Sequence, residues 1–217
     1  MSIKQDLAAN IVRHWDFRKG SLLDSSGNND TAVVVGTPEW KNTNKGKSIN
    51  FAKSTGDYLT QTAKPATAGT IIVISEEPVA NNSIMVGAQV TTRCYLGSTA
   101  LNTLMGGLAD QPFSTIVGTT VKEVGKVYHN AISWDGNNVD LTLNGSNEYS
   151  GAQVGTLPDL EWFIGGHNLS GSPSAINMWA GNILEVIVFD IKLTSEQMSQ
   201  LYEEMTQEGY IGTLAKR

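Results

Sequence analysis

Cysteine is almost absent from this chain, and charged residues of both signs are sparse. Cys94 is the only cysteine among the 217 residues, so no disulfide can form within the chain. Charged residues make up 17% of the sequence, whereas about 25% is typical of soluble proteins. This composition excludes a coiled coil and a charge-rich disordered chain. Because a chain of this length buries about 70% of its surface on folding, we expect a hydrophobic core to stabilise it.

Basic residues are too few to suggest a nucleic-acid partner. The chain has 15 Lys and Arg against 21 Asp and Glu, which gives a net charge of −6. A negative chain repels a phosphate backbone unless a local basic patch overcomes the repulsion. The densest basic group is Lys41, Lys45 and Lys47, and it lies among Asn, Thr and Gly. These neighbours predict a solvated loop, and no nucleic acid is expected to bind.

Long hydrophobic runs are also missing. The longest, residues 70–74 and 183–189, are far shorter than the roughly 18 residues that a membrane-spanning helix needs. We therefore expect no membrane insertion. The first residues, 1–7, contain no apolar run after Lys4, which predicts a chain without a secretory signal peptide that is made in the cytoplasm.

Most of the chain instead consists of short segments rich in β-branched and aromatic residues, separated by Gly, Asn, Asp, Ser and Pro. This spacing predicts an all-β antiparallel sandwich, because a βαβ protein would need helical patterns between its strands. The predicted strands cover residues 31–35, 48–52, 58–62, 70–75, 83–90, 93–97, 113–117, 127–134, 139–143, 161–164 and 183–189. A lead-in strand is expected within residues 11–17. Tight turns are expected at residues 135–138 and 144–145, which contain Asp-Gly and Asn-Gly steps.

A single strong helical pattern lies near the C-terminus. Thr194 and Gln197 have the spacing of a capping box, in which each side chain bonds the other residue's backbone N–H. Apolar residues then follow at helical spacing up to Met205, and Gly209 is a plausible stop. The pattern predicts one short amphipathic helix packed against a sheet.

Nucleophilic catalysis needs a nucleophile beside a base that a third group orients. The chain contains three histidines, His14, His129 and His167, and they lie in no recognisable catalytic motif. His14 and His129 fall in strand patterns, where we expect His129 to face solvent or to be hydrogen-bonded in the sheet. His167 follows two glycines and has the most site-like context. Cys94 is predicted to be a small buried hydrophobic residue.

Glycoside hydrolysis needs two carboxylates about 5–9.5 Å apart. Glu185 is the only acid within its predicted strand, and Asp190 at the strand's end lies on the opposite face by parity. Glu76 and Glu77 are adjacent and so point to opposite sides of their strand. We therefore expect no catalytic residues and no enzymatic activity.

Residues 24–30 carry two aspartates with Ser, Gly and Asn between them. Their oxygens could contribute to a calcium site, but the same residues also form ordinary Asx turns. Calcium therefore stays an option without assignable ligands, and no other cofactor is expected.

The five tryptophans are the remaining candidates for a binding site. Trp15, Trp134 and Trp162 lie in apolar strand patterns and are expected in the core. Trp40 and Trp179 have more open surroundings. Because an aromatic face can stack on a sugar ring, Trp40 and Trp179 are predicted as glycan-contacting residues.

Taken in order, the motifs of this chain resemble a laminin G-like domain of the concanavalin A-like lectin/glucanase superfamily. The similarity spans residues 11–202, and it rests on HWDF, LLDSSGNND, GKSINFAKSTGDYLTQ, HNAISWDGNNVDLTLNGS, FIGG and WAGNILEVIVFDIKLTSEQMSQLY, which begin at His14, Leu22, Gly46, His129, Phe163 and Trp179. The resemblance implies a two-sheet antiparallel jelly roll with one short C-terminal helix. Residues 1–10 would then form an N-terminal segment, 11–208 the domain and 209–217 a C-terminal tail.

The resemblance leaves several functions open, because members include lectins, adhesion modules, glucanases and structural modules. Such domains usually act outside the cell, yet a chain without a leader is expected to fold in the cytoplasm. Bacteriophage virion proteins fold in the host cytoplasm and reach the outside of the cell by lysis. We therefore expect a non-enzymatic capsid decoration, head-fibre or tail protein, located in the virion, with adhesion or glycan binding as an added role. Its expected partners are other virion proteins, further copies of itself and cell-surface glycans. The alternative is a secreted carbohydrate-binding lectin-like module.

Overall fold

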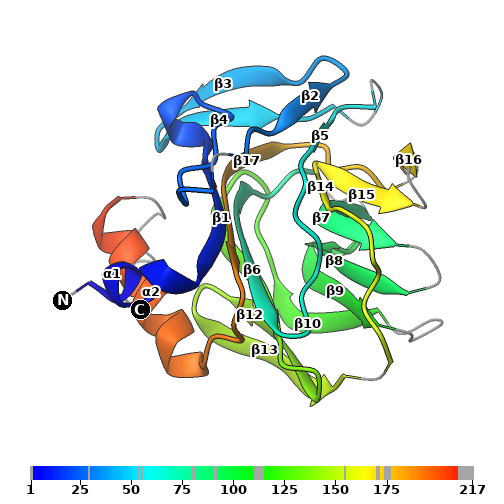
Figure 1. The fold of residues 1–217 in the computed structure, drawn as a ribbon. Helices are drawn as coiled ribbons and strands as arrows, with labels where there is room; N and C mark the ends of the chain where they lie inside the picture. Colours follow the sequence, from blue (N-terminus) through cyan, green and yellow to red (C-terminus); the bar gives the residue numbers. More distant parts are fainter. Residues whose placement is uncertain are drawn as a thin grey trace.

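A computed structural model describes residues 2–28, 30–52, 54, 56–79, 82–89, 92–109, 115–153, 155–169, 172–173 and 177–209. In this part of the chain two β-sheets face each other, and two α-helices lie together on the outer side of one of them (Figure 1). The predicted all-β jelly-roll sandwich with a short C-terminal helix is confirmed. No helix among these residues is long and apolar enough to cross a membrane.

The first sheet is centred on two long apolar strands, β6 and β17. Its eight described strands are β13 (Ser146–Ala152), β12 (Asn138–Leu143), β11 (Val127–Trp134), β6 (Gly69–Glu76), β17 (Asn182–Phe189), β4 (Gly46–Asn50), β3 (Glu39–Thr43) and β1 (Ile11–Asp16). Strand β4 pairs with the first two residues of β17, and β1 pairs with the remainder of the same edge. The order of the strands therefore brings the N-terminal strand beside the C-terminal one.

The second sheet faces the first across the main core. Its nine described strands are β10 (Ile116–Val121), β9 (Thr103–Ala109), β8 (Arg93–Ser98), β7 (Ser83–Gln89), β14 (Phe163–Ile164), β5 (Tyr58–Thr60), β2 (Val33–Val35), β15 (Gly166–Leu169) and β16 (Ser172–Pro173). Strands β15 and β7 run parallel, while the other strand pairs of both sheets are antiparallel.

Five of the described strands were not predicted from the sequence, namely β3, β9, β13, β15 and β16. Residues 41–47, predicted as a solvated loop, lie in the hairpin of β3 and β4, so that expectation was wrong. The hairpin is at the exposed edge of its sheet, where polar side chains face water and the apolar alternation is lost. Strand β9 contains two glycines, and β13 is polar, so neither has the pattern of a half-buried strand. The predicted strand at 113–117 lies partly outside the described residues.

The two predicted tight turns are present. Gly136 has φ +87° in the connection from β11 to β12. Asn144 and Gly145 connect β12 to β13 with φ values of +50° and +75°. Two successive residues of positive φ match the right-handed twist of a hairpin, which explains the Asn-Gly step.

Apolar side chains fill two separate layers. The main core lies between the sheets and includes Trp15, Trp134, Trp162 and Trp179. A second cluster lies between the outer face of the first sheet and the helix α2 (Ser195–Gln207). The short N-terminal helix α1 (Ile3–Asp6) and the 3₁₀ turn η1 (Ala8–Asn10) lie next to it, and Leu7 between them is buried in the second cluster. In β6, alternate residues serve the two layers, with Ile71 and Ile72 as an example.

The predicted capping box of α2 is also confirmed. The Thr194 hydroxyl accepts the Gln197 backbone N–H at 3.2 Å, and the Gln197 side chain accepts the Thr194 backbone N–H at 2.9 Å. Gly209 follows the helix at φ +78°.

Replacing Thr194 with alanine should lower the free energy of unfolding by about 1 kcal/mol, because the cap then leaves a helical N–H without its acceptor. Chemical denaturation of the variant measures this loss. The same change at the neighbouring exposed Ser195 is the control, and an equal loss there would mean that the cap itself contributes nothing.

Candidate functional site

The outer face of the second sheet contains a flat apolar area built by alternation of large and small residues. Tyr95 on β8 is paired with Gly87 on β7 and with Gly107 on β9. A Cβ at Gly107 would overlap the Tyr95 ring, and one at Gly87 would lie 2.6 Å from the Tyr95 Cβ. The two glycines therefore allow the tyrosine ring to lie across its neighbouring strands.

In the next row of the same face, the glycine is on the central strand and the large side chains are on the two neighbouring strands. Gly97 on β8 lies between Ile84 on β7 and Met105 on β9. Ile84, Met105 and Tyr95 form a small cluster of their own, apart from the core between the sheets. Each of these three residues is at most 5% exposed, so they form a buried apolar floor on this face.

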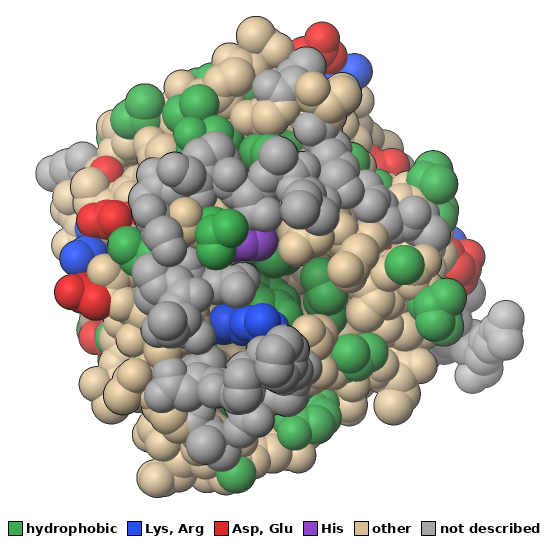
Figure 2. Space-filling view, turned by 90° about the vertical axis from the view of Figure 1, so that its right-hand side faces the viewer, with side chains coloured by type: hydrophobic (Ala, Val, Ile, Leu, Met, Phe, Trp, Pro, Cys, Tyr) green, Lys and Arg blue, Asp and Glu red, His purple; other side chains and the backbone are tan. Residues whose placement is uncertain are grey.

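Polar groups surround this apolar area and form a hollow of about 260 Å³ above it. Its lining consists of amide, hydroxyl and guanidinium side chains around the three apolar ones: Asn82, Ile84, Arg93, Tyr95, Thr99, Met105, Thr115 and Asn177. The Tyr95 hydroxyl is hydrogen-bonded to the Thr115 hydroxyl at 2.9 Å. Figure 2 shows this side of the molecule, with a basic side chain and a histidine near the middle, among hydrophobic side chains.

Arg93 provides the permanent charge of the hollow. His167 on β15 pairs with Gly87 and is buried beside it. Burial and the nearby charge of Arg93 lower the pKa of His167 from 6.5 to about 4. His167 is therefore neutral at physiological pH, and its Nδ1 has no hydrogen-bond partner within the described residues.

The two tryptophans predicted to contact a glycan have different surroundings. Trp40 on β3 is 43% exposed, and its ring packs edge-on against Phe17. Trp179 is 0% exposed and belongs to the core between the sheets, so its predicted role was wrong. The polar residues around Trp179 in the sequence concealed its burial. Trp40 lies on the first sheet, so the two predicted residues do not form one site.

Two of the predictions about single residues can also be compared with the structure. Cys94 is buried, as predicted, and burial raises the pKa of its thiol to about 12, so it is not a nucleophile at neutral pH. His129 was expected to face solvent or to be hydrogen-bonded, and this was wrong. Its side chain is 0% exposed beneath α2, its ring contacts Tyr202 edge-on, and neither ring nitrogen has a partner in the described structure.

The aspartates of the loop at residues 24–30 are bonded to protein groups. Asp24 accepts the backbone N–H groups of His14 and Ser26. Asp30 accepts the Arg13 guanidinium at 3.2 Å and the Thr62 hydroxyl at 2.7 Å. These contacts hold the loop closed. The Arg13 guanidinium lies beside Asp24 and Asp30, where a metal ion would need to lie. The described residues include no cluster of three or more His, Cys, Asp or Glu side chains that could hold a metal ion.

A pair of carboxylates that the sequence did not predict occurs across strands. Asp16 on β1 is paired with Glu185 on β17. Arg18 bridges them, at 2.7 Å from Asp16 and 2.9 Å from Glu185, and His14 contacts Glu185 at 2.6 Å. Burial opposes the ionisation of Asp16, but Arg18 and Lys19 outweigh it and hold the pKa of Asp16 below its ordinary value. The arrangement is an ion-pair network.

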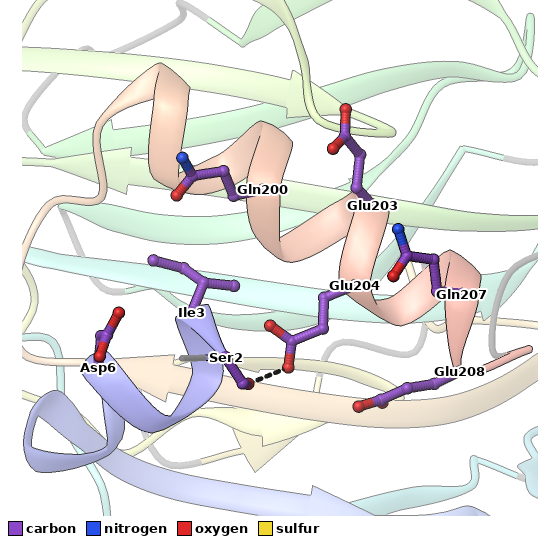
Figure 3. Close-up of a pocket in the computed structure, with 8 residues that line it drawn as sticks. All are labelled: Ser2, Ile3, Asp6, Gln200, Glu203, Glu204, Gln207 and Glu208. Carbon is purple, nitrogen blue, oxygen red and sulfur yellow. Dashed lines mark hydrogen bonds between the residues drawn. The ribbon is translucent and has the colours of Figure 1, made fainter.

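A second hollow, about 780 Å³, lies between α1 and α2 (Figure 3). Acidic and amide side chains dominate its lining, which consists of Ser2, Ile3, Asp6, Gln200, Glu203, Glu204, Gln207 and Glu208. Ser2 is hydrogen-bonded to Glu204 across the groove, and Lys4 forms an ion pair with Glu208 at 2.7 Å. These contacts join the N-terminal residues to the C-terminal helix. The groove has no aromatic side chain on which a sugar could stack.

Comparison with known proteins identifies the family. Residues 61–199, more than half of the chain, match a laminin G model described as the concanavalin A-like lectin/glucanases superfamily. No curated protein matches the sequence.

Solved structures share the fold at low sequence identity. Domain 4 of AbnA, an extracellular arabinanase from Geobacillus stearothermophilus solved with arabinotriose, has a TM-score of 0.65 at 18% identity, covering 89% of this chain and 98% of that domain. The receptor-binding domain of botulinum neurotoxin type G has a TM-score of 0.68 at 14% identity, covering 90% of this chain and 51% of the other. A heptameric pentraxin from Limulus polyphemus reaches 0.51 at 20% identity, covering 61% and 68%. The chain belongs to the concanavalin A-like lectin/glucanases superfamily.

Proposed function

We propose that this protein is a non-enzymatic carbohydrate-binding domain that contacts a glycan in the hollow over β7, β8 and β9. The observation that carries the proposal is the combination of an apolar base with amide, hydroxyl and guanidinium groups around it. A sugar ring has an apolar face and a rim of hydroxyls. Tyr95 and Met105 form a floor in which each residue is 5% exposed, so hydrogen bonds from Arg93 and Asn177 to the hydroxyl rim would supply most of the recognition.

The similar structures support this proposal. The arabinanase domain was solved with a bound arabinose oligomer. Botulinum neurotoxin type C, another protein of similar fold, depends for cell entry on interaction with two ganglioside molecules. Both share the fold of this chain, at 18% and 12% sequence identity. Arabinose oligomers and acidic glycans such as gangliosides are therefore the first probes for this chain, and Arg93 favours the acidic ones.

Screening on a glycan array tests the function itself. We expect the wild-type protein to bind a restricted set of glycans, and Arg93→Ala to weaken that binding by about tenfold or more, because hydrogen bonds to a charged donor contribute about 1.5–3 kcal/mol. Lys41→Ala, a change at an exposed basic residue on the other sheet, is the matched control. Absence of binding to every glycan on an array that includes arabinose oligomers and gangliosides would contradict the proposal.

A role on a bacteriophage virion is a finer hypothesis, and it stays a prediction. It would make the glycan site an adhesion surface and the protein an oligomer held by other virion proteins. Mass spectrometry of purified particles tests it. A monomer that binds a glycan and is absent from particles would favour the secreted lectin-like module.

A further inference from the structure

A buried polar cluster lies between the two sheets, away from the glycan-binding face. Lys122 follows β10, Glu77 follows β6, Ser98 ends β8, and Asn130 belongs to β11. Each of these residues is at most 2% exposed. A fully buried lysine is rare in proteins, so the surroundings of its amine indicate its role.

The Lys122 amine lies among three polar groups. Its Nζ is 2.5 Å from the Glu77 Oε2, 2.5 Å from the Ser98 Oγ and 3.2 Å from the Asn130 Oδ1. The amine therefore contacts both a carboxylate and a carboxamide.

The carboxamide of Asn130 has a defined orientation. Its Nδ2 donates to the Val73 carbonyl at 3.1 Å, to the Ser75 hydroxyl at 3.1 Å and to the Tyr128 carbonyl at 3.2 Å. Because the amide nitrogen is bound to these acceptors, the oxygen must be the atom that faces the lysine. The carbonyl group is thus directed at the amine.

Burial also changes the protonation of the pair. Desolvation raises the pKa of Glu77 and lowers the pKa of Lys122, and the attraction between their charges only partly opposes these shifts. The Glu77 Oε1 is buried and has no hydrogen-bond partner among the described groups. Transfer of a proton from the ammonium to the carboxylate gives a neutral amine, which is a nucleophile, and a carboxylic acid beside it.

We propose that Lys122 and Asn130 join in an intramolecular amide cross-link, with Glu77 as the group that accepts and returns the proton. The Lys122 Nζ forms a bond to the Cγ of Asn130, and the bond from Cγ to Nδ2 breaks. The first proton of the ammonium passes to Glu77, which donates it to the amide as the carbonyl carbon is attacked. A second proton of the lysine nitrogen then passes to Glu77, and the nitrogen of Asn130, which carries the first proton, leaves as ammonia. No oxidant or other reactant is needed.

The cross-link would join the two sheets. Lys122 lies in the connection that leaves the edge strand β10 of the second sheet, and Asn130 lies on β11 within the first sheet. The bond would close the segment 122–130 into a covalent ring and fix this connection in place. The chain has a single cysteine and cannot form an internal disulfide. The amide would give it a covalent cross-link that needs no cysteine.

Mass spectrometry tests the proposal on the wild-type protein. We expect the intact mass to be lower than the sequence mass by about 17 Da, the mass of the ammonia lost when an amine displaces a carboxamide nitrogen. After denaturation, trypsin should not cleave at Lys122, and the peptide 94–126 should remain joined to the peptide 127–192. An unchanged mass with normal cleavage at Lys122 would overturn the proposal, as would a loss of ammonia within the peptide 127–192 alone.

Variants separate the roles of the three residues. Lys122→Met, Asn130→Ala and Glu77→Gln should each retain the full sequence mass, since they remove the nucleophile, the carbonyl group and the proton acceptor. Lys126→Met, at an exposed lysine of the same connection, should still lose ammonia. If Glu77→Gln formed the cross-link as completely as the wild type, Glu77 would have no part in the proton transfer. The wild-type measurement stands even if a variant fails to fold.

Discussion

Replacing Glu77 with alanine is expected to lower the free energy of unfolding by about 3–5 kcal/mol, as typically follows from removing one partner of a buried ion pair. The change leaves the amine of Lys122 in a site with 0% side-chain exposure, without the carboxylate that lies 2.5 Å from it. Because Glu77 is also the proposed proton acceptor, the cross-link does not form in this variant, and the oxygens of Ser98 and Asn130 do not replace the lost carboxylate. Equilibrium denaturation with urea measures the loss.

The double variant Glu77→Met with Lys122→Met is the control for this prediction. Apolar residues of similar size in place of both partners often restore or increase stability, so most of the electrostatic loss should be recovered. The part that stays lost measures the contribution of the proposed cross-link. A double variant no more stable than Glu77→Ala would show that packing, rather than the unpaired amine, explains the loss.

Acidification should destabilise the protein between about pH 6.5 and pH 4 through two buried histidines, His129 and His167. Burial beneath α2, with a small contribution from the charge of Lys4, lowers the pKa of His129 from 6.5 to about 4. Across this interval the unfolded chain binds a proton that the folded protein does not bind, so stability falls as the pH falls. Below about pH 4 the folded protein binds it as well, and this effect ends. A shift of this size corresponds to about 3 kcal/mol for one group.

The same reasoning applies to His167, whose pKa is also lowered to about 4. His129→Leu should therefore remove about half of the acid-induced loss, since leucine keeps an apolar contact with Tyr202 and cannot be protonated. Urea denaturation of both proteins across the interval from about pH 7 to about pH 4 is the measurement. Parallel pH profiles for the variant and the wild type would contradict the assignment to His129.

The fold could be predicted because its central strands follow simple rules. Strands β6, β11 and β17 are rich in β-branched residues, and turn residues with positive φ separate the hairpins. The helix α2 has both its cap and its apolar stripe in the local sequence. Edge strands were harder to predict. In β3 and β13 one or both faces contact water, so polar side chains replace the alternation that marks a half-buried strand.

The candidate site could not be predicted in the same way, because it depends on neighbours across strands. Gly87 and Gly107 lie on either side of Tyr95 only after pairing of β7, β8 and β9. Lys122 and Asn130 meet only when the connection after β10 enters the space between the sheets. A signal was present in the repeated glycines of residues 87, 97, 106 and 107, since glycine within a strand often marks a close approach. The burial of Trp179 and His129 likewise follows from the packing of distant elements.

The most direct test of the glycan-binding site compares Arg93→Ala with Trp40→Ala. Isothermal titration calorimetry with the strongest ligand from the array, one variant at a time, gives both affinities under the same conditions. Binding in the hollow over β7, β8 and β9 predicts a loss of about tenfold or more for Arg93→Ala and an unchanged affinity for Trp40→Ala, because Trp40 lies on the other sheet. The reverse result, with affinity lost at Trp40 and kept at Arg93, would contradict the site proposed for this protein.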